Sequence, residues 1–183
     1  MEKCKIVDSE YLFKRPWLTV RKDKLLLPTG VINDEYYVLE YPTWVNVIAI
    51  TKEGQYVMIE QYRHGLQDIF TELVAGVAED GEEPIDAARR ELAEETGYGG
   101  GVWELNTILS ANPSTTNNLT YCFIAHDVEQ IGRQHLDRTE DIDIKLLSET
   151  EVIAMLKADE MKQALMAASL WKHFLKIRVK SEK

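Results

Sequence analysis

The segment Gly76–Tyr98, which reads GVAEDGEEPIDAARRELAEETGY, decides how this chain is interpreted. A proline near its start and a glycine near its end predict a helix over residues 83–97. At about 100° per residue, Glu91, Glu94 and Glu95 fall on one stripe of that helix. Three carboxylates near the C-terminal end of a helix repel one another and oppose the helix dipole. The stripe therefore needs positive charge, and its hard oxygen ligands favour Mg²⁺ or Mn²⁺ over zinc.

The rest of this helix predicts how the acidic stripe is presented. Its apolar face is suited to pack on a sheet and consists of Ile85, Ala88 and Leu92. Arg89 and Arg90 can neutralise part of the stripe, and Glu82 adds a fourth carboxylate just before the helix. A solvated acidic face with ordinary Arg–Glu pairs is the alternative interpretation.

The spacing of the fixed residues decides between these interpretations, because it resembles the Nudix box in full. Five residues separate Gly76 from Glu82, and seven more precede the run Arg90-Glu91-Leu92, any residue, Glu94-Glu95, any residue, Gly97 and apolar Tyr98. Agreement by chance at this many positions is very improbable. By this resemblance the chain is identified as a member of the Nudix hydrolase family.

The resemblance implies a fold and a reaction. The fold is α/β (α+β): an α/β/α sandwich with a mixed sheet, on which the box forms a metal-binding loop–helix–loop. The reaction is attack of water on a phosphorus atom of a pyrophosphate, with Mg²⁺, or Mn²⁺, activating the water and neutralising phosphate charge. Such ions would also bridge an acidic protein and an anionic substrate.

The resemblance also assigns roles to single residues of the box. The metal-binding glutamates are Glu91, Glu94 and Glu95, with Glu91 and Glu95 as the direct ligands. The Ala75 carbonyl would complete the metal shell, and Gly76 would let the chain turn tightly. Glu82 and Arg90 would orient or support the ligands.

Flanking segments resemble the ADP-ribose and nucleoside diphosphate sugar pyrophosphatases within this family. They are the run IEQYR, which ends at Arg63, the run ELVAG, which begins at Glu72, and Pro113, sixteen residues beyond Gly97. The resemblance implies that Arg63 binds a substrate phosphate and that Glu72 reaches the ribose or the metal shell. The loop of residues 110–118 departs from the usual sequence, which leaves the base and the sugar open.

A later acidic loop and the N-terminal strands complete the implied site. Glu140 is the candidate general base, with Asp141 and Asp143 as alternatives and a plain acidic turn as the non-functional interpretation. Trp17 and Tyr36 are expected to pack within the N-terminal strands, with stacking on the nucleobase as the functional alternative. The same resemblance implies a homodimer, to which the N-terminal strands contribute.

Composition restricts the classes of function. The chain has 183 residues, 45% of them hydrophobic, and a net charge of −10, which argues against non-specific binding to nucleic acid or to an anionic membrane. The cysteines, Cys4 and Cys122, fit no zinc site and are expected to be reduced thiols. No signal peptide and no apolar run of about 20 residues is evident. A cytoplasmic enzyme without a membrane anchor is the expectation.

Two domains are expected: an N-terminal subdomain of short antiparallel strands over residues 1–43, and the Nudix domain over residues 44–183. Strands are predicted over residues 11–20, 24–27, 36–41, 43–51, 56–62, 70–77, 102–110, 119–128 and 142–147. A capping box at Ser148 predicts a short helix, and a final amphipathic helix is predicted over residues 161–177.

The leading hypothesis is a hydrolase that converts ADP-ribose, or a related nucleoside diphosphate sugar, to a nucleoside monophosphate and a sugar phosphate. One alternative keeps the chemistry and changes the substrate to a GDP-sugar or an oxidised nucleoside triphosphate. Another is a non-catalytic nucleotide-sugar sensor. The chain keeps every carboxylate of the box, which disfavours the sensor.

Overall fold

The computed structural model describes residues 1–181, and their side chains as far as residue 179. The chain forms two compact units, one made of Met1–Pro42 with Ser110–Leu119 and one made of Thr43–Leu109 with Thr120–Lys183. The loop Ser110–Leu119 thus belongs to the N-terminal unit, although both of its ends join strands of the other unit. Backbone hydrogen bonds attach it to Leu39, which donates to the Thr115 carbonyl at 2.7 Å.

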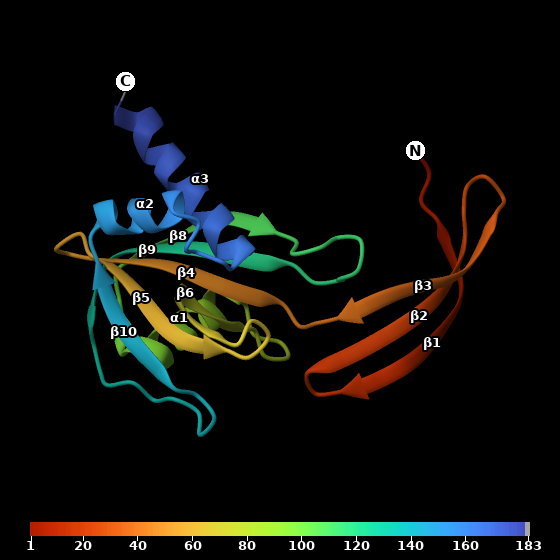
Figure 1. The fold of residues 1–183 in the computed structure, drawn as a ribbon, viewed down its shortest axis with the longest axis horizontal. Helices are drawn as coiled ribbons and strands as arrows, with labels where there is room; N and C mark the ends of the chain where they lie inside the picture. Colours follow the sequence, from red (N-terminus) through yellow and green to blue (C-terminus); the bar gives the residue numbers. More distant parts are fainter. Residues whose placement is uncertain (182–183) are drawn as a thin grey trace. The chain divides into compact units, whose positions relative to one another are not determined.

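The N-terminal unit is a three-stranded antiparallel sheet in the order β1-β2-β3 (Figure 1). Its strands are β1 (Lys5–Arg15), β2 (Leu18–Leu26) and β3 (Ile32–Glu40). The prediction of one strand over residues 11–20 was wrong, because Pro16 and Trp17 form the turn between β1 and β2. Apolar residues continue across that turn, and only the proline, which lacks the N–H of a ladder donor, signals the break.

The second unit is built on a mixed sheet of strands in the order β10-β5-β6-β4-β9-β7, with β8 also paired to β9. These strands are β4 (Trp44–Thr51), β5 (Tyr56–Arg63), β6 (Asp68–Val77), β7 (Tyr98–Gly99), β8 (Val102–Leu109), β9 (Thr120–Gln130) and β10 (Ile142–Leu147). Strands β4 and β9 are parallel, and the other pairs are antiparallel. The predicted β4–β5 hairpin exists, but β4 and β5 pair at only two positions. Beyond them β6 lies between the two, which places the first residues of the box in the middle of the sheet.

Helices cover both faces of this sheet and make it an α/β/α sandwich, as expected. Figure 1 shows α1 (Pro84–Thr96) on one side and α2 (Glu149–Lys157) with α3 (Ala164–Ser181) on the other. One apolar core lies under α1 and includes Ala88 and Leu92, while a second core lies under α2 and α3. None of the helices in residues 1–181 is long and apolar enough to cross a membrane.

Local signals place the ends of α1 and the start of α2 where the sequence predicts them, whereas the final helix, α3, spans Ala164–Ser181 instead of the predicted residues 161–177. Helix α1 ends at Gly97, whose φ of 72° is the left-handed conformation that glycine adopts without strain. Helix α2 begins after Ser148, which forms the predicted capping box with Glu151. The helix that carries the acidic stripe therefore has bounds set by its own sequence.

Candidate active site

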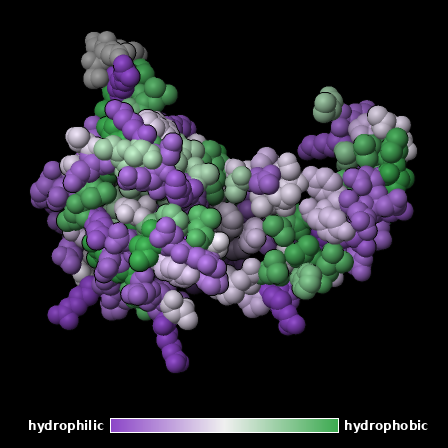
Figure 2. Space-filling model, in the orientation of Figure 1, coloured by the Kyte–Doolittle hydropathy of each residue, from purple (hydrophilic) through white to green (hydrophobic). Residues whose placement is uncertain are grey.

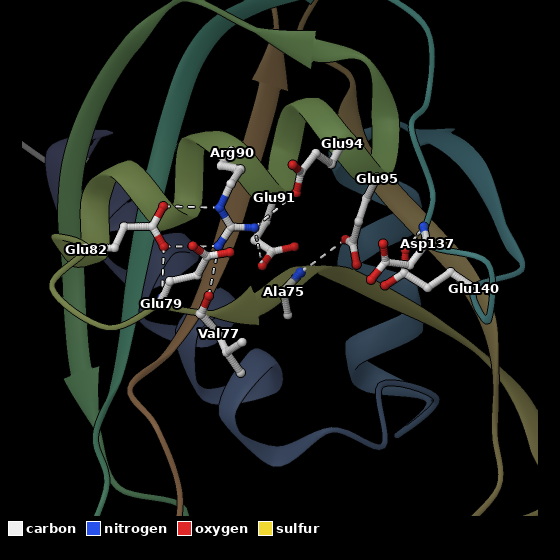
Figure 3. Close-up of polar contacts among 10 residues, drawn as sticks. All are labelled: Ala75, Val77, Glu79, Glu82, Arg90, Glu91, Glu94, Glu95, Asp137 and Glu140. Atoms are coloured by element: carbon white, nitrogen blue, oxygen red, sulfur yellow. Dashed lines mark hydrogen bonds and ion pairs between the residues drawn. The ribbon is translucent and has the colours of Figure 1, made fainter. Parts of the chain in front are cut away.

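Arg90 lies at the centre of the acidic stripe (Figure 3). Its Nη1 donates to Glu91 Oε1 at 2.9 Å and to Glu94 Oε2 at 3.0 Å. Its Nε and Nη2 each donate to the Glu82 carboxylate at 3.1 Å, and Nη2 also donates to the Val77 carbonyl at 2.9 Å. The guanidinium holds the pKa of Glu82 below its usual range. Arg90 therefore joins helix α1, the loop before it and the end of strand β6.

Glu91 and Glu95 are the buried carboxyl groups of the site. The Glu91 side chain is 14% exposed and Glu95 is 5% exposed. Burial raises the pKa of Glu91, and burial together with the charge of Glu91 raises the pKa of Glu95 to about 8. Glu95 Oε2 accepts a long hydrogen bond, 3.4 Å, from the Ala75 N–H. This carboxylate is thus buried with little compensation from the chain itself.

Gly76 is required at this site for a reason other than the expected tight turn, which the structure contradicts. It lies inside β6, opposite Val45 of β4, and a Cβ atom built on it would lie 2.0 Å from Cδ of Glu91. The missing side chain leaves the space that the Glu91 carboxylate fills. Any other residue at this position would displace Glu91.

Glu140 lies across from Glu95, in the loop between β9 and β10 (Figure 3). Its charge contributes to the raised pKa of Glu95. The Asp137 N–H donates to Glu140 Oε2 at 2.9 Å, and the Glu140 N–H donates to the Asp137 carbonyl at the same distance. Glu140 and the alternatives Asp141 and Asp143 are all exposed, but of the three it is Glu140 whose charge acts on Glu95. Glu140 is the candidate base that the structure brings to the box glutamates.

Gln134 holds this loop against helix α1, and sequence reasoning missed it. Its Nε2 donates to the Glu95 carbonyl at 2.7 Å and to the Ile142 carbonyl at 3.1 Å. The His135 N–H donates to the Glu94 carbonyl at 2.8 Å. Carbonyls in the last turn of a helix lack intrahelical donors, so these bonds both satisfy α1 and position the loop. No local pattern links Gln134 to a helix 39 residues earlier.

Arg63 and Glu72 form a second polar group, on neighbouring strands β5 and β6. Arg63 Nε donates to Glu72 Oε2 at 3.0 Å and to Oε1 at 3.2 Å. The Arg63 side chain is 44% exposed, whereas Glu72 is 4% exposed. The buried carboxylate thus fixes a guanidinium that still has an open face. Both residues line a cavity of about 430 Å³, which Ala75 and Gly76 also line.

Trp17 belongs to the N-terminal unit, but the expectation that it packs within the strands was wrong, because it lies in the β1–β2 turn and is 80% exposed. Tyr36 is in the same unit, and its hydroxyl donates to the Ser114 carbonyl at 2.5 Å. A stacking role for either ring stays a prediction.

The donor chemistry of the site fits a divalent cation. Within residues 1–181, no three His, Cys, Asp or Glu side chains are already gathered into one metal shell. Arg90 instead contacts both Glu91 and Glu94. The fit rests on the hard oxygen atoms of two buried carboxylates. Arg90 compensates part of the Glu91 charge, whereas the chain offers Glu95 little compensation.

Comparison with known proteins identifies the family to which this chain belongs. Residues 40–169 match the NUDIX domain, and residues 5–39 match the nucleoside diphosphate sugar hydrolase N-terminal domain. The chain belongs to the Nudix family. As a Nudix hydrolase it depends on divalent metal ions, and the residues that match the box, Gly76–Tyr98, include the buried carboxylates described above.

Relatives of this Nudix protein extend over nearly its whole length. It is 26% identical over 180 residues to an "ADP-ribose pyrophosphatase" of Bacillus subtilis (strain 168), an alignment that covers 98% of this chain and 97% of that protein. It is 31% identical over 154 residues to a "Methanol dehydrogenase activator" of Bacillus methanolicus, which covers 84% and 83% of the two chains. A crystal structure of an "ADP compounds hydrolase" matches with a TM-score of 0.86 and 21% identity, over 98% of this chain and 97% of that one. That structural likeness shows the fold.

Proposed function

We propose that this Nudix hydrolase cleaves the diphosphate of ADP-ribose, or of a closely related nucleoside diphosphate sugar, to a nucleoside monophosphate and a sugar phosphate. The observation that carries the proposal is the buried pair Glu91 and Glu95, which faces Glu140 across the site. The match of residues 5–39 to the nucleoside diphosphate sugar hydrolase N-terminal domain supports a nucleotide sugar over a nucleoside triphosphate.

Residues of this chain supply a base and a site for phosphate. Glu140 accepts a proton from the attacking water, and the Asp137 N–H holds its carboxylate in place. Arg63 binds a phosphate oxygen with the open face of its guanidinium, while Glu72 keeps that face oriented. Glu140 thus supplies the negative charge that takes up the proton, and Arg63 supplies the positive charge that binds the phosphate.

The box glutamates would hold the metal. Glu91 and Glu95 are the proposed direct ligands, with the Ala75 carbonyl and Glu94 beside them, while Gly76, Glu82 and Arg90 support them. When bound, Mg²⁺, or Mn²⁺ in its place, supplies neutralisation of the diphosphate charge and a lower pKa for water. Arg90 would keep Glu91 and Glu94 in place, because it already donates to both.

The N-terminal residues 1–43 are proposed to form a homodimer interface, with Trp17 contributing to the nucleobase site. The support is a set of exposed apolar side chains on the β1–β3 sheet, where Ile6, Val7 and Phe13 are all more than half exposed. Figure 2 shows hydrophobic patches on this unit among hydrophilic residues. An isolated three-stranded sheet gains stability when such a surface is covered. A solution mass of twice the 21.0 kDa chain is expected, and a mass of one chain would remove this part of the proposal.

The test of the activity is a substrate panel with Mg²⁺ and with a chelator. The panel contains ADP-ribose, other ADP-sugars, a GDP-sugar and an oxidised nucleoside triphosphate, and products are separated by chromatography. ADP-ribose is expected to give the highest kcat/KM and to release AMP with ribose 5-phosphate. Preferred release of pyrophosphate from the triphosphate would replace the proposal, and absence of any metal-dependent hydrolysis would refute it.

A further inference from the structure

The loop of residues 131–141, which connects β9 to β10, returns to the C-terminal end of helix α1. The N–H groups of Ile131 and Gly132 donate to the Gly97 carbonyl at 2.9 and 3.1 Å. A Cβ atom built on Gly97 would lie 2.6 Å from the Gly132 carbonyl oxygen, so the missing side chain allows this close approach. The last glycine of the box therefore both ends the helix and admits the loop that carries Glu140.

A side chain makes the second attachment of this loop. Gln134 is partly buried, and its Nε2 donates to the carbonyls of Glu95 and Ile142 at 2.7 and 3.1 Å. One carboxamide thus joins the last turn of α1 to the first residue of β10. Leu136 packs against the core under α1. Residues 137–141 are left between these fixed points.

The segment 137–141 carries Glu140 and is shaped by its own hydrogen bonds. The Asp137 N–H donates to Glu140 Oε2, and the Glu140 N–H donates to the Asp137 carbonyl, both at 2.9 Å. Because both bonds lie inside the segment, they fix its shape but not its position relative to α1. That position has to come from the attachments on either side of it, and Gln134 bonds to both neighbouring elements.

We propose that Gln134 is a positioning residue for the hydrolysis, whose carboxamide holds Glu140 at its place opposite the box glutamates. The inference rests on the proposed function, in which Glu140 takes a proton from water and Glu95 holds the metal. Gln134 bonds to the backbone carbonyl of Glu95, so the Glu95 carboxylate stays available to the metal. A general base must lie within hydrogen-bond reach of the water, and a displacement of about 1 Å can lower a rate by about a hundredfold.

The competing explanation is that Gln134 only satisfies a carbonyl at the end of α1. Loss of its amide would then weaken the helix that carries the metal ligands, and it would lower activity whether or not Glu140 is present. In the proposed role, the loss acts through Glu140 alone. A double-mutant cycle between Gln134 and Glu140 separates the two explanations.

The cycle compares the wild type, Gln134→Met, Glu140→Gln and the double variant, with ADP-ribose and Mg²⁺. Methionine keeps the length of the side chain and removes the donor. We expect Gln134→Met to lower kcat about tenfold when Glu140 is present and less than about twofold when Glu140 is glutamine. KM and the Mg²⁺ concentration for half-maximal activity should stay at their wild-type values. The matched control, Gln130→Met, changes an exposed side chain at the end of β9 and should keep the wild-type kcat.

Thermal unfolding without metal shows whether each variant is folded. If Gln134→Met does not fold, Gln134→Asn, which keeps the amide on a shorter side chain, takes its place in the cycle with the same expectation. An equal loss of kcat in both backgrounds, a wild-type kcat, or a weakened Mg²⁺ affinity would overturn the positioning role and leave the proposed function intact. A wild-type protein that does not hydrolyse ADP-ribose would instead refute the function, and the positioning role with it.

Discussion

Asp23 and Glu95 are both buried carboxyl groups, but they lie in two regions of the chain that differ in the partners they offer. The pKa of the two groups shifts in opposite directions as a result. Asp23, in β2 of the N-terminal sheet, accepts from Ser9 Oγ at 2.6 Å and from Arg21 at 2.8 and 3.0 Å. These bonds lower the pKa of Asp23. Glu95, on α1, has the Ala75 N–H at 3.4 Å, and its pKa rises to about 8.

The difference separates a structural carboxylate from a functional one. A carboxylate that forms ion pairs and hydrogen bonds with its own chain stabilises the fold. Its removal leaves a buried partner unpaired. A buried carboxylate without such partners lowers the stability of the metal-free fold, and it is available to bind a ligand. Stability and activity should therefore respond in opposite ways to neutralisation of the two groups.

The largest effect is expected from Glu95→Gln. Loss of a metal ligand should remove several kcal/mol of transition-state stabilisation, which corresponds to a fall in kcat of at least about a hundredfold. The metal-free variant should unfold at the wild-type temperature or above it, because at neutral pH the wild-type fold must either protonate Glu95 or bury its charge, and glutamine avoids both costs. Activity assays and thermal unfolding check both halves, with exposed Glu53→Gln as the control. If the variant with both Glu94 and Glu95 replaced by glutamine keeps its hydrolysis and its Mg²⁺ affinity, the box glutamates are not the metal-binding residues.

Glu140→Gln should lower kcat by about a hundredfold, since a general base contributes at least that much. Folding and metal affinity should change little, because Glu140 is exposed and lies across from the proposed ligands. Asp141→Asn and Asp143→Asn are the matched variants. If one of these loses turnover and Glu140→Gln does not, the base has been assigned to the wrong residue.

Asp23→Asn should act on stability rather than on chemistry. Removal of the charge leaves Arg21 without its main partner and should lower the free energy of unfolding by about 2 to 3 kcal/mol. Denaturant unfolding measures the change, and Ser9→Ala, which removes one hydrogen bond, should cost less. An Asp23→Asn protein as stable as the wild type would show that the contrast with Glu95 has been drawn too sharply.

The smallest effect concerns His173, a buried group on the opposite face of the sheet whose partner is neutral. It is 3% exposed and lies 2.9 Å from the Tyr56 hydroxyl, and burial, with the charges of His126 and Lys176 and against that of Glu104, lowers its pKa to about 4. The His173 side chain thus binds fewer protons in the folded protein than in the unfolded chain below pH 6.5. The contribution of His173 to stability is complete above that pH and should fall by about 1.5 kcal/mol between pH 6.5 and 5. This fall is measured in the Glu95→Gln background, because the raised pKa of Glu95 changes stability in the opposite direction over the same range.

His173→Gln should flatten this dependence, whereas exposed His64→Gln should keep it. Unfolding in denaturant over that pH range makes the measurement. A slope unchanged in His173→Gln would assign the acid sensitivity to another group.

Local features of the fold could be predicted from the sequence, because neighbours along the chain create them. The bounds of α1 follow from a proline and Gly97, the capping box at Ser148 begins α2, and β-branched runs mark the central strands. The turn at Pro16 was missed because apolar residues lie on both sides of it. The order of the strands, with β6 between β4 and β5, depends on long-range pairing that no local pattern contains.

The sequence by itself determined the acidic stripe, since helix periodicity alone puts Glu91, Glu94 and Glu95 together. Only the tertiary structure decided the surroundings of each group. Gly76 leaves the space that Glu91 fills, and Gln134 holds the loop that brings Glu140 opposite Glu95. Asn46 and Thr120 are buried with side-chain oxygens that have no hydrogen-bond partner. These are contacts between segments far apart in the chain. Burial and pairing are properties of such contacts, so the pKa of a carboxylate cannot be read from its position in the sequence.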